Sequence, residues 1–218
     1  IAPLTNYWGF GPEDGPLIVD SAKVSRLLRL VNYSKLKIVD DSLLLPEGMQ
    51  LDYNSIAQGY SVDIIANFLQ SQGILHYLIE IGGELRSKGK NADKEVWIVG
   101  VEKPIEIEDD NQSYQIILSL DNASLATSGN YRKYKEINNV KYSHTISTTT
   151  GYFENNRMLS VTVIHPDCVF ADAYATAFMA MGIKRSKEFI NNQSELDVYF
   201  VYTDINGNWK DFMTNRLE

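Results

Sequence analysis

Residues 159–182 read LSVTVIHPDCVFADAYATAFMAMG, and this stretch combines a strand pattern with a helix pattern. Leu159 to His165 is rich in β-branched residues, which predicts a strand. Ala171 to Met181 is rich in alanine and methionine, which favour helix, and Gly182 follows as a stop signal. The stretch therefore predicts a chain that contains both sheet and helix.

The segments on either side add more strands than helices. A short helix is predicted after a cap at Asp20 or Ser21, and a longer one over Tyr60 to Gln72, ended by Gly73. Their apolar residues recur with helical period: Val24, Leu27, Leu28 and Val31 in the first, and Ile64, Ile65, Phe68 and Leu69 on one face of the second. A further short helix is predicted over residues 186–191.

Strands are predicted over residues 76–81, 96–101, 114–120 and 198–203, the last pairing with residues 209–213 across a DINGN turn, and a strand or hairpin over 36–45. The strands do not alternate with helices as a doubly wound sheet requires. We therefore expect an α+β fold with largely antiparallel sheets, forming a single domain over residues 1–218.

Composition narrows the class of protein. The chain has 218 residues, of which 44% are hydrophobic and 22% charged, as in ordinary folded proteins. Its net charge of -8, with no dense basic run, gives no electrostatic footprint for nucleic acid. Cys168 is the only cysteine, which excludes an intramolecular disulfide and a CxxC pair. No segment approaches the roughly 20 apolar residues that span a bilayer.

Asp172 and Thr176 interrupt the otherwise apolar helix pattern. Four residues apart, they lie on one helical face, so a carboxylate and a hydroxyl point at the same spot. Both supply the hard oxygen atoms that Mg²⁺ or Ca²⁺ prefers. The alternative is that Asp172 interacts with the helix dipole and Thr176 bonds back to the preceding turn. The spacing alone leaves both interpretations open.

Polar residues also gather just before the helix over Tyr60 to Gln72. The segment 51–63, LDYNSIAQGYSVD, brings Asp52, Asn54, Ser55 and Gln58 close together. Because the first N–H groups of a helix lack partners and carry the positive end of its dipole, this is a plausible phosphate site. The alternative is that Asn54 or Ser55 simply caps the helix.

Two further segments are suited to binding a ligand. EIGGE at residues 80–84 has two glycines after an apolar strand, which permit close approach of a ligand to the backbone but also make plain turns. SLATSGN at residues 124–130 and YSHTISTTTG at 142–151 combine hydroxyl groups with glycine. His144 lies in the second and is suited to proton transfer near neutral pH, although a lone histidine is more often structural.

Taken in order along the chain, these segments resemble the signature of the ApbE family, the FAD:protein FMN transferases. The resemblance runs through YWGF, LDYNSIAQGYSVD, IEIGGELRSKG, WIVGVEKP, LATSGNY, YSHTISTTTG and ADAYATAFMAMG, and spans nearly the whole chain. Several motifs in a fixed order are far more specific than any one of them. The resemblance implies an ApbE-like, T-fold-related domain.

The resemblance also implies a role for each matching position. Asp52 and Gln58 would contact FAD, and the carbonyl of Ser55 would join the side chains of Asp172 and Thr176 around a metal ion. The other residues would lie against the flavin nucleotide or line the same cleft: Ile146, Gly82, Gly83, Ser128 and Gly129. The metal is expected to be Mg²⁺, with Ca²⁺ as an alternative, and FAD is expected to be the substrate.

The implied reaction moves FMN from FAD to a Thr or Ser hydroxyl of an acceptor flavoprotein and releases AMP. A Mg²⁺ ion bridging the pyrophosphate neutralises the negative charge that develops as the phosphorus is attacked. A hydroxyl near its ordinary pKa is a poor nucleophile, so a general base is expected. We assign this role to His144 as a hypothesis, beside Asp172 as the second catalytic residue.

Three departures from the family pattern bear on these expectations. Gln58 stands where the family commonly has Lys or Glu, and Ser147 replaces an acidic residue of the IDPxTG motif, which would weaken a second metal position. Family members also have a region before the WGF segment that carries an export signal or lipid anchor, and this chain is expected to lack it. A periplasmic location, with membrane contact only through such an anchor, is an expectation from the family alone.

Two other functions are compatible with the same motifs. With water as the acceptor, the same site would make an FAD pyrophosphatase that yields FMN and AMP. A non-catalytic periplasmic FAD-binding protein is the third reading, and it predicts that FAD is retained without turnover.

Overall fold

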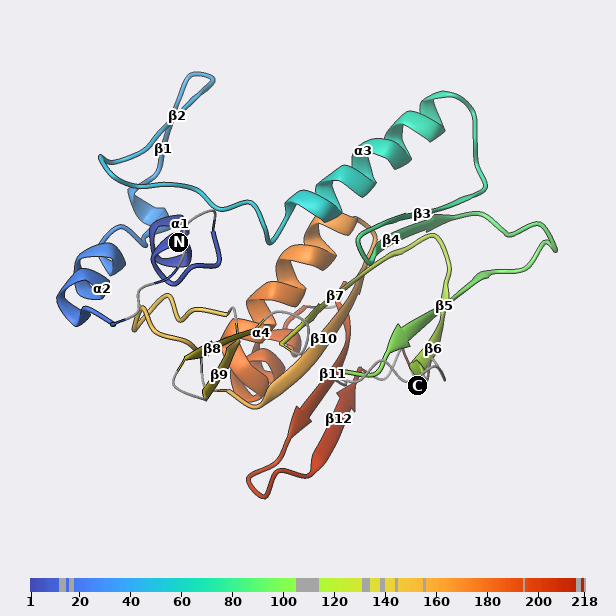
Figure 1. Cartoon of the computed structure of the whole chain (residues 1–218). Helices are drawn as coiled ribbons and strands as arrows, with labels where there is room; N and C mark the ends of the chain where they lie inside the picture. The colour runs from blue at the N-terminus through green and yellow to red at the C-terminus, as the bar shows by residue number, and fades with distance from the viewer. Residues whose placement is uncertain are drawn as a thin grey trace. The chain divides into compact units, whose positions relative to one another are not determined.

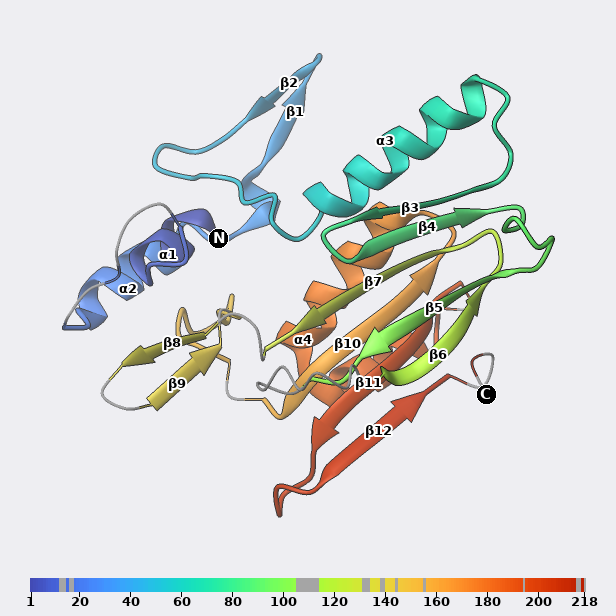
Figure 2. The same cartoon turned by 45° about the vertical axis from the view of Figure 1, so that its right-hand side comes forward.

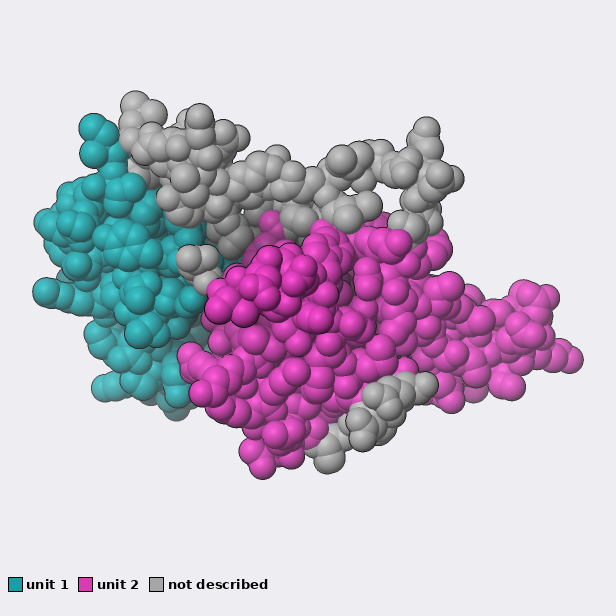
Figure 3. Space-filling model, turned by 90° about the horizontal axis from the view of Figure 1, so that it is seen from below, with its two compact units in different colours: residues 1–53, 134–155 teal, residues 54–133, 156–218 magenta. Residues whose placement is uncertain are grey.

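The computed structural model describes residues 1–11, 15, 18–104, 114–130, 134–137, 140–143, 145–154, 156–193, 195–214 and 217 (Figure 1). The chain forms two compact units, shown in teal and magenta in Figure 3. Unit 1 comprises residues 1–53 and 134–155, and unit 2 comprises residues 54–133 and 156–218. The expectation of a single domain stays a prediction.

Unit 1 is built from short elements around a small aromatic core. Its elements are α1 (Ala2–Tyr7), α2 (Ser21–Leu28), the 3-10 helix η1 (Tyr33–Lys35), β1 (Lys37–Val39), β2 (Ser42–Leu44), β8 (Tyr134–Ile137) and β9 (Val140–Ser143). Asp20 caps α2 by accepting the N–H groups of Ala22 and Lys23, as predicted. The segment predicted as a strand or hairpin is the β1–β2 hairpin.

A six-stranded sheet forms the centre of unit 2, in the order β12-β11-β10-β7-β4-β3 (Figure 2). Its strands are β3 (Tyr77–Ile81), β4 (Glu84–Lys88), β7 (Ser124–Gly129), β10 (Met158–His165), β11 (Asp197–Thr203) and β12 (Trp209–Met213). Every neighbouring pair is antiparallel, which confirms the predicted α+β class. The sequence patterns predicted four of these strands and missed β4 and β7.

The sheet of unit 2 is covered on both faces. Helices α3 (Ala57–Ser71) and α4 (Cys168–Ile190) pack on one face, and the hairpin of β5 (Trp97–Glu102) and β6 (Tyr114–Leu120) packs on the other. Successive strand residues point to opposite faces, so Val163 packs in the α4 cluster while Ile164 packs in the hairpin cluster. Both faces of strand β10 are therefore buried, and even its polar residues Ser160 and Thr162 are shielded from solvent.

Helix α3 buries a different face from the one its large apolar residues suggest. Ile64, Ile65 and Phe68 are 48%, 40% and 62% exposed, whereas Val62 and Ala66 are fully buried. The face that meets α4 begins with a glycine, where the two backbones come too close for large side chains. Close helix packing therefore outweighs simple hydrophobic periodicity here.

Helix α4 has a break at Gly182, whose φ of 73° lies in the left-handed region. The predicted stop at this glycine is correct locally, and the short helix predicted over residues 186–191 is the continuation of α4 to Ile190. Asn156 supports the break by donating its side-chain N–H to the carbonyl of Met179, at 2.6 Å. Within the described ranges, no helix has the length and apolar character needed to cross a bilayer.

Candidate functional site

Helix α4 holds Asp172 and Thr176 on the face expected from their spacing. Ala171, Ala175 and Phe178 are fully buried in the core between α4 and the sheet, which fixes the rotation of the helix. Asp172 is only 4% exposed, and Thr176 is half-buried. Helix α4 thus carries a buried ionisable side chain among residues that are mostly apolar.

Asp172 contacts the beginning of α3. The backbone N–H of Gly59 donates to Oδ2 of Asp172 at 3.0 Å. A Cβ atom on Gly59 would lie 2.4 Å from the carbonyl oxygen of Cys168 and 2.8 Å from Cβ of Asp172. Only glycine lets the two helices approach closely enough for this hydrogen bond, so Gly59 belongs to the candidate site.

The Asp172 carboxylate is poorly compensated for a buried charge. Burial raises its pKa above the ordinary value, and the hydrogen bond from Gly59 opposes that rise. Among the described residues, the Gly59 N–H is the one hydrogen-bond donor to this carboxylate, and no Lys or Arg pairs with it. Because an isolated buried carboxylate is costly, the position is suited to a bound cation.

Thr176 meets a second hydroxyl on the sheet. Its Oγ1 lies 3.3 Å from Oγ of Ser128, which is on β7 opposite Val161 of β10. Asp172, Thr176 and Ser128 thus place one carboxylate and two hydroxyl groups along the side of α4 that leads to β7. These are hard oxygen donors of the kind that Mg²⁺ and Ca²⁺ bind.

The start of α3 does not match the interpretation that Asn54 or Ser55 caps this helix. The helix begins at Ala57 and its N-cap position falls on Ile56, which has no polar side-chain atom, so neither Asn54 nor Ser55 occupies that position. The N–H of Gly59, in the first turn, is satisfied by Asp172 of the other helix instead. Ser55 lies in the turn directly before the helix. That its backbone carbonyl is a metal ligand stays a prediction.

The two glycines of EIGGE form the turn between β3 and β4. Gly82 and Gly83 have φ values of 66° and 108°, which side-chain-bearing residues rarely adopt. A Cβ on Gly82 would lie 1.9 Å from Nε2 of Gln58, whereas one on Gly83 would meet nothing within 4 Å. The exposed Gln58 side chain therefore lies directly over Gly82, and Gly83 faces open space. Gly129 ends β7 beside Ser128.

The other predicted site residues belong to unit 1. Asp52 is half-buried, two residues before unit 2 begins. Ile146 is buried in the core of unit 1 with Leu4 and Trp8. His144 lies outside the described residues, so its assignment as a base stays a prediction. Ser147 accepts the N–H groups of Thr149 and Thr150 at 3.3 Å, so its hydroxyl supports the local turn.

A metal held here would depend on few charged ligands. Throughout the described part of the chain, no three His, Cys, Asp or Glu side chains come together as a metal-binding group. The candidate ligands would be one carboxylate with hydroxyl and carbonyl oxygens, a set that suits a hard cation and not zinc. The sequence patterns did not indicate Gly59, because the helix was predicted to start at Tyr60. A start at Ala57 places an isolated glycine inside the helix, which is a signal of a packing or functional constraint.

Comparison with known proteins gives consistent results. The model of the ApbE family matches residues 1–200. A protein named FAD:protein FMN transferase from Vibrio cholerae serotype O1 is 42% identical over 188 residues, which are 85% of this chain and 55% of the relative. A protein of the same name from Escherichia coli strain K12 is 31% identical over 208 residues, 92% of this chain and 58% of the relative.

Solved structures show the same similarity. The flavin transferase ApbE from Vibrio cholerae has a TM-score of 0.84 and 37% identity, covering 99% of this chain and 67% of that chain. The apo form of the flavinyl transferase ApbE from Pseudomonas stutzeri has a TM-score of 0.84 and 32% identity, covering 98% and 65%. This chain thus spans a little over half the length of the curated relatives it matches.

Proposed function

This chain belongs to the ApbE family, and from that premise we propose that the protein is an FAD:protein FMN transferase that uses Mg²⁺. The proposed substrate is FAD, the acceptor is a Thr or Ser hydroxyl of another protein, and the second product is AMP. The relatives with this name support the transferase class. The chemistry of the buried oxygen groups supports the metal.

The observation that carries the proposal is the state of Asp172. Its carboxylate is buried, receives one hydrogen bond and has no cationic side chain beside it among the described residues. A buried charge of this kind is stable only when a counter-charge compensates the loss of hydration. The hydroxyl of Thr176 lies on the same helical face, and Ser128 adjoins it. These groups fit a hard divalent cation.

Three oxygen atoms would hold the metal: a carboxylate oxygen of Asp172, the hydroxyl of Thr176 and the backbone carbonyl of Ser55. Bound Mg²⁺ supplies positive charge that neutralises the pyrophosphate of FAD as its phosphorus is attacked. Asp172 keeps one oxygen on the Gly59 N–H, which leaves its other oxygen for the cation. Either hydroxyl of the Thr176–Ser128 pair can be the donor, and when Thr176 donates, the lone pairs of its oxygen are available to the metal.

In the proposed reaction, the acceptor hydroxyl oxygen bonds to the phosphorus of the FMN half of FAD. The anhydride bond to AMP breaks, AMP leaves with the bridging oxygen, and the hydroxyl proton passes to a base, for which we propose His144. The Gly82–Gly83 turn presents backbone without side chains, which permits a phosphate or ring to approach closely. Gln58 can hydrogen-bond a substrate there without adding charge.

Mass spectrometry of an acceptor protein tests the proposal. The full-length protein is incubated with FAD, Mg²⁺ and a candidate acceptor flavoprotein, and the acceptor is expected to gain the mass of FMN. Asp172→Asn retains an oxygen for the Gly59 N–H but removes the charge, so transfer is expected to fall by at least roughly 100-fold. Asp204→Asn, in the exposed β11–β12 turn, is the matched control and should transfer FMN normally.

The outcomes separate the transferase from its alternatives. AMP release without modification of any acceptor would indicate hydrolysis of FAD by water. Retention of FAD without AMP release would indicate a binding protein. Normal transfer by Asp172→Asn would remove the proposed metal site, since the only charged ligand would then be dispensable.

A further inference from the structure

Neither α3 nor α4 carries a side-chain cap of its own, and each helix is capped by an aspartate of the other. The N-cap residues are Ile56 in α3 and Asp167 in α4, and neither makes a side-chain cap hydrogen bond. Asp172 of α4 instead accepts the first-turn N–H of Gly59 in α3. In the opposite direction, Asp63 of α3 accepts from the first turn of α4.

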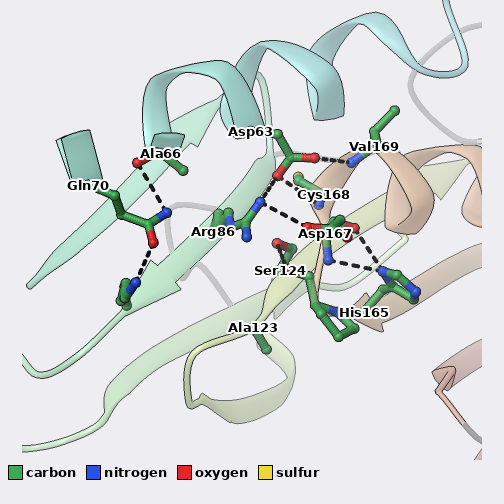
Figure 4. Close-up of polar contacts among 12 residues, drawn as sticks. Asp63, Ala66, Gln70, Arg86, Ala123, Ser124, His165, Asp167, Cys168 and Val169 are labelled. Atoms are coloured by element: carbon green, nitrogen blue, oxygen red, sulfur yellow. Dashed lines mark hydrogen bonds and ion pairs between the residues drawn. The ribbon is translucent and has the colours of Figure 1, made fainter. Parts of the chain in front are cut away.

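Asp63 uses both of its oxygen atoms in this exchange (Figure 4). Its Oδ1 accepts the backbone N–H of Cys168 at 3.0 Å, and its Oδ2 accepts that of Val169 at 2.9 Å. A carboxylate at this place also interacts favourably with the positive end of the α4 dipole. The contacts join residues more than 100 positions apart and fix the start of α4 against α3.

Arg86 of β4 completes the group by pairing with Asp63. Its Nη1 also lies 3.3 Å from Oδ1 of Asp167. The two acidic partners differ in environment, since the Asp63 side chain is 10% exposed and the Asp167 side chain is 48% exposed. The pair with Asp63 is therefore the one shielded from water, and the pair with Asp167 is a surface interaction of small energy.

Asp63 thus joins the three elements that carry the candidate site of unit 2. Helix α3 begins two residues after Ser55, α4 carries Asp172 one turn after Cys168, and β4 follows directly on the Gly82–Gly83 turn. Because a helix is stiff over a single turn, holding its first N–H groups also sets the position of Asp172. Small displacements matter, since metal ligation tolerates only a few tenths of an ångström.

We propose that Asp63 is a positioning residue for the cation site, which it serves by fixing the start of α4, and with it Asp172 and Thr176, against α3 and β4. This inference rests on the proposed function. Asp63 does not contact the metal. It acts through the Cys168 and Val169 N–H groups and through Arg86, so its loss displaces the ligands and lowers metal affinity beyond any effect on folding.

The experiment compares Mg²⁺ affinity with stability in the full-length protein. Calorimetric titration with Mg²⁺ gives Kd for the wild type, Asp63→Asn, Asp63→Glu and Asp167→Asn, and urea denaturation gives the stability of each. Val201→Ala, which truncates a buried residue of β11, serves as a destabilised control. All titrations are made where the variant is fully folded.

We expect Asp63→Asn to raise Kd by roughly 10-fold or more, the usual effect of losing a residue that orients a metal ligand. Asp167→Asn and Val201→Ala should leave Kd within about 3-fold of the wild type, although the latter is destabilised. Should Asp63→Asn not fold, Asp63→Glu keeps the charge but moves the carboxylate, and it should raise Kd severalfold.

The results distinguish this inference from the proposed function. Wild-type protein that binds Mg²⁺, together with an unchanged Kd in the folded Asp63 variants, would overturn the positioning role alone. A Kd that rises equally in Val201→Ala would do the same, because the effect would then follow stability. Wild-type protein that binds no Mg²⁺ would overturn the cation site and the positioning role together.

Discussion

Replacing Gly59 with alanine tests the close contact between α3 and α4. The added Cβ would lie 2.4 Å from the Cys168 carbonyl oxygen, about 1 Å short of the 3.4 Å at which ordinary van der Waals contact begins. It would also lie 2.8 Å from Cβ of Asp172. All of these obstacles are backbone or rigid atoms, so the helices themselves must separate.

The expected loss of stability follows from three contributions. Overpacking a tight contact costs about 1–3 kcal/mol. Lengthening the 3.0 Å hydrogen bond from Gly59 to the Asp172 carboxylate costs about 1.5–3 kcal/mol. The same movement relieves the clash, so these two costs overlap and do not add in full. Alanine favours helix over glycine by about 1 kcal/mol. We expect Gly59→Ala to lower the free energy of unfolding by about 2 kcal/mol.

Urea denaturation followed by circular dichroism measures this change. Ser61→Ala is the matched control, because it places the same side chain two residues further along α3 on the exposed side. Its effect should stay within about 0.5 kcal/mol. If Gly59→Ala were as stable as the wild type or more stable, helix propensity would outweigh the steric term, and the reasoning about close helix approach would be refuted.

Three other predictions concern charge and titration. Asp172→Asn removes an uncompensated buried charge, so without metal the thermal midpoint of the variant should equal or exceed that of the wild type. The increase in thermal midpoint on adding Mg²⁺ should disappear in the variant, and calorimetry with and without Mg²⁺ measures both effects. Burial, aided by the nearby Asp63 carboxylate, raises the pKa of the Cys168 thiol, so less thiolate forms at pH 8. A disulfide reagent should therefore react with the folded protein more than roughly tenfold slower than with the unfolded protein, and equal rates would contradict the burial. Hydrogen bonds from Asn208 lower the pKa of Asp204 below 3.8, so the contribution of Asp204 to stability is present above that pH and lost on acidification. Asp204→Ala should therefore flatten the acid side of a profile of urea midpoint against pH, and an unchanged profile would contradict this contribution.

Local sequence signals were sufficient for most of the regular structure. Asp20 could be predicted as one of two cap candidates, beside Ser21, because its partners, Ala22 and Lys23, are two and three residues away. The β10 strand and the first part of α4 follow from patterns within a few residues. By contrast, β4 and β7 were missed, because polar residues such as Glu84 and Ser124 are buried there by neighbouring elements and break the expected alternation.

The candidate site shows the same division. The spacing of Asp172 and Thr176 on one helical face was evident along the chain, and the ordered motifs indicated the family. Gly59, Asp63 and Arg86 were not singled out, because their partners lie between 23 and 113 residues away. No window of sequence shows that one helix supplies the cap of another.

Amino-acid order alone was therefore enough to establish the α+β class, the family and the helix that presents an acidic and a hydroxyl group together. Tertiary packing decided that Asp172 is buried with a single hydrogen bond, that α3 turns its small residues toward α4, and that two distant aspartates exchange capping roles. The physical reason is that periodicity and caps act within a few residues, whereas desolvation and close backbone contact arise only when distant segments meet.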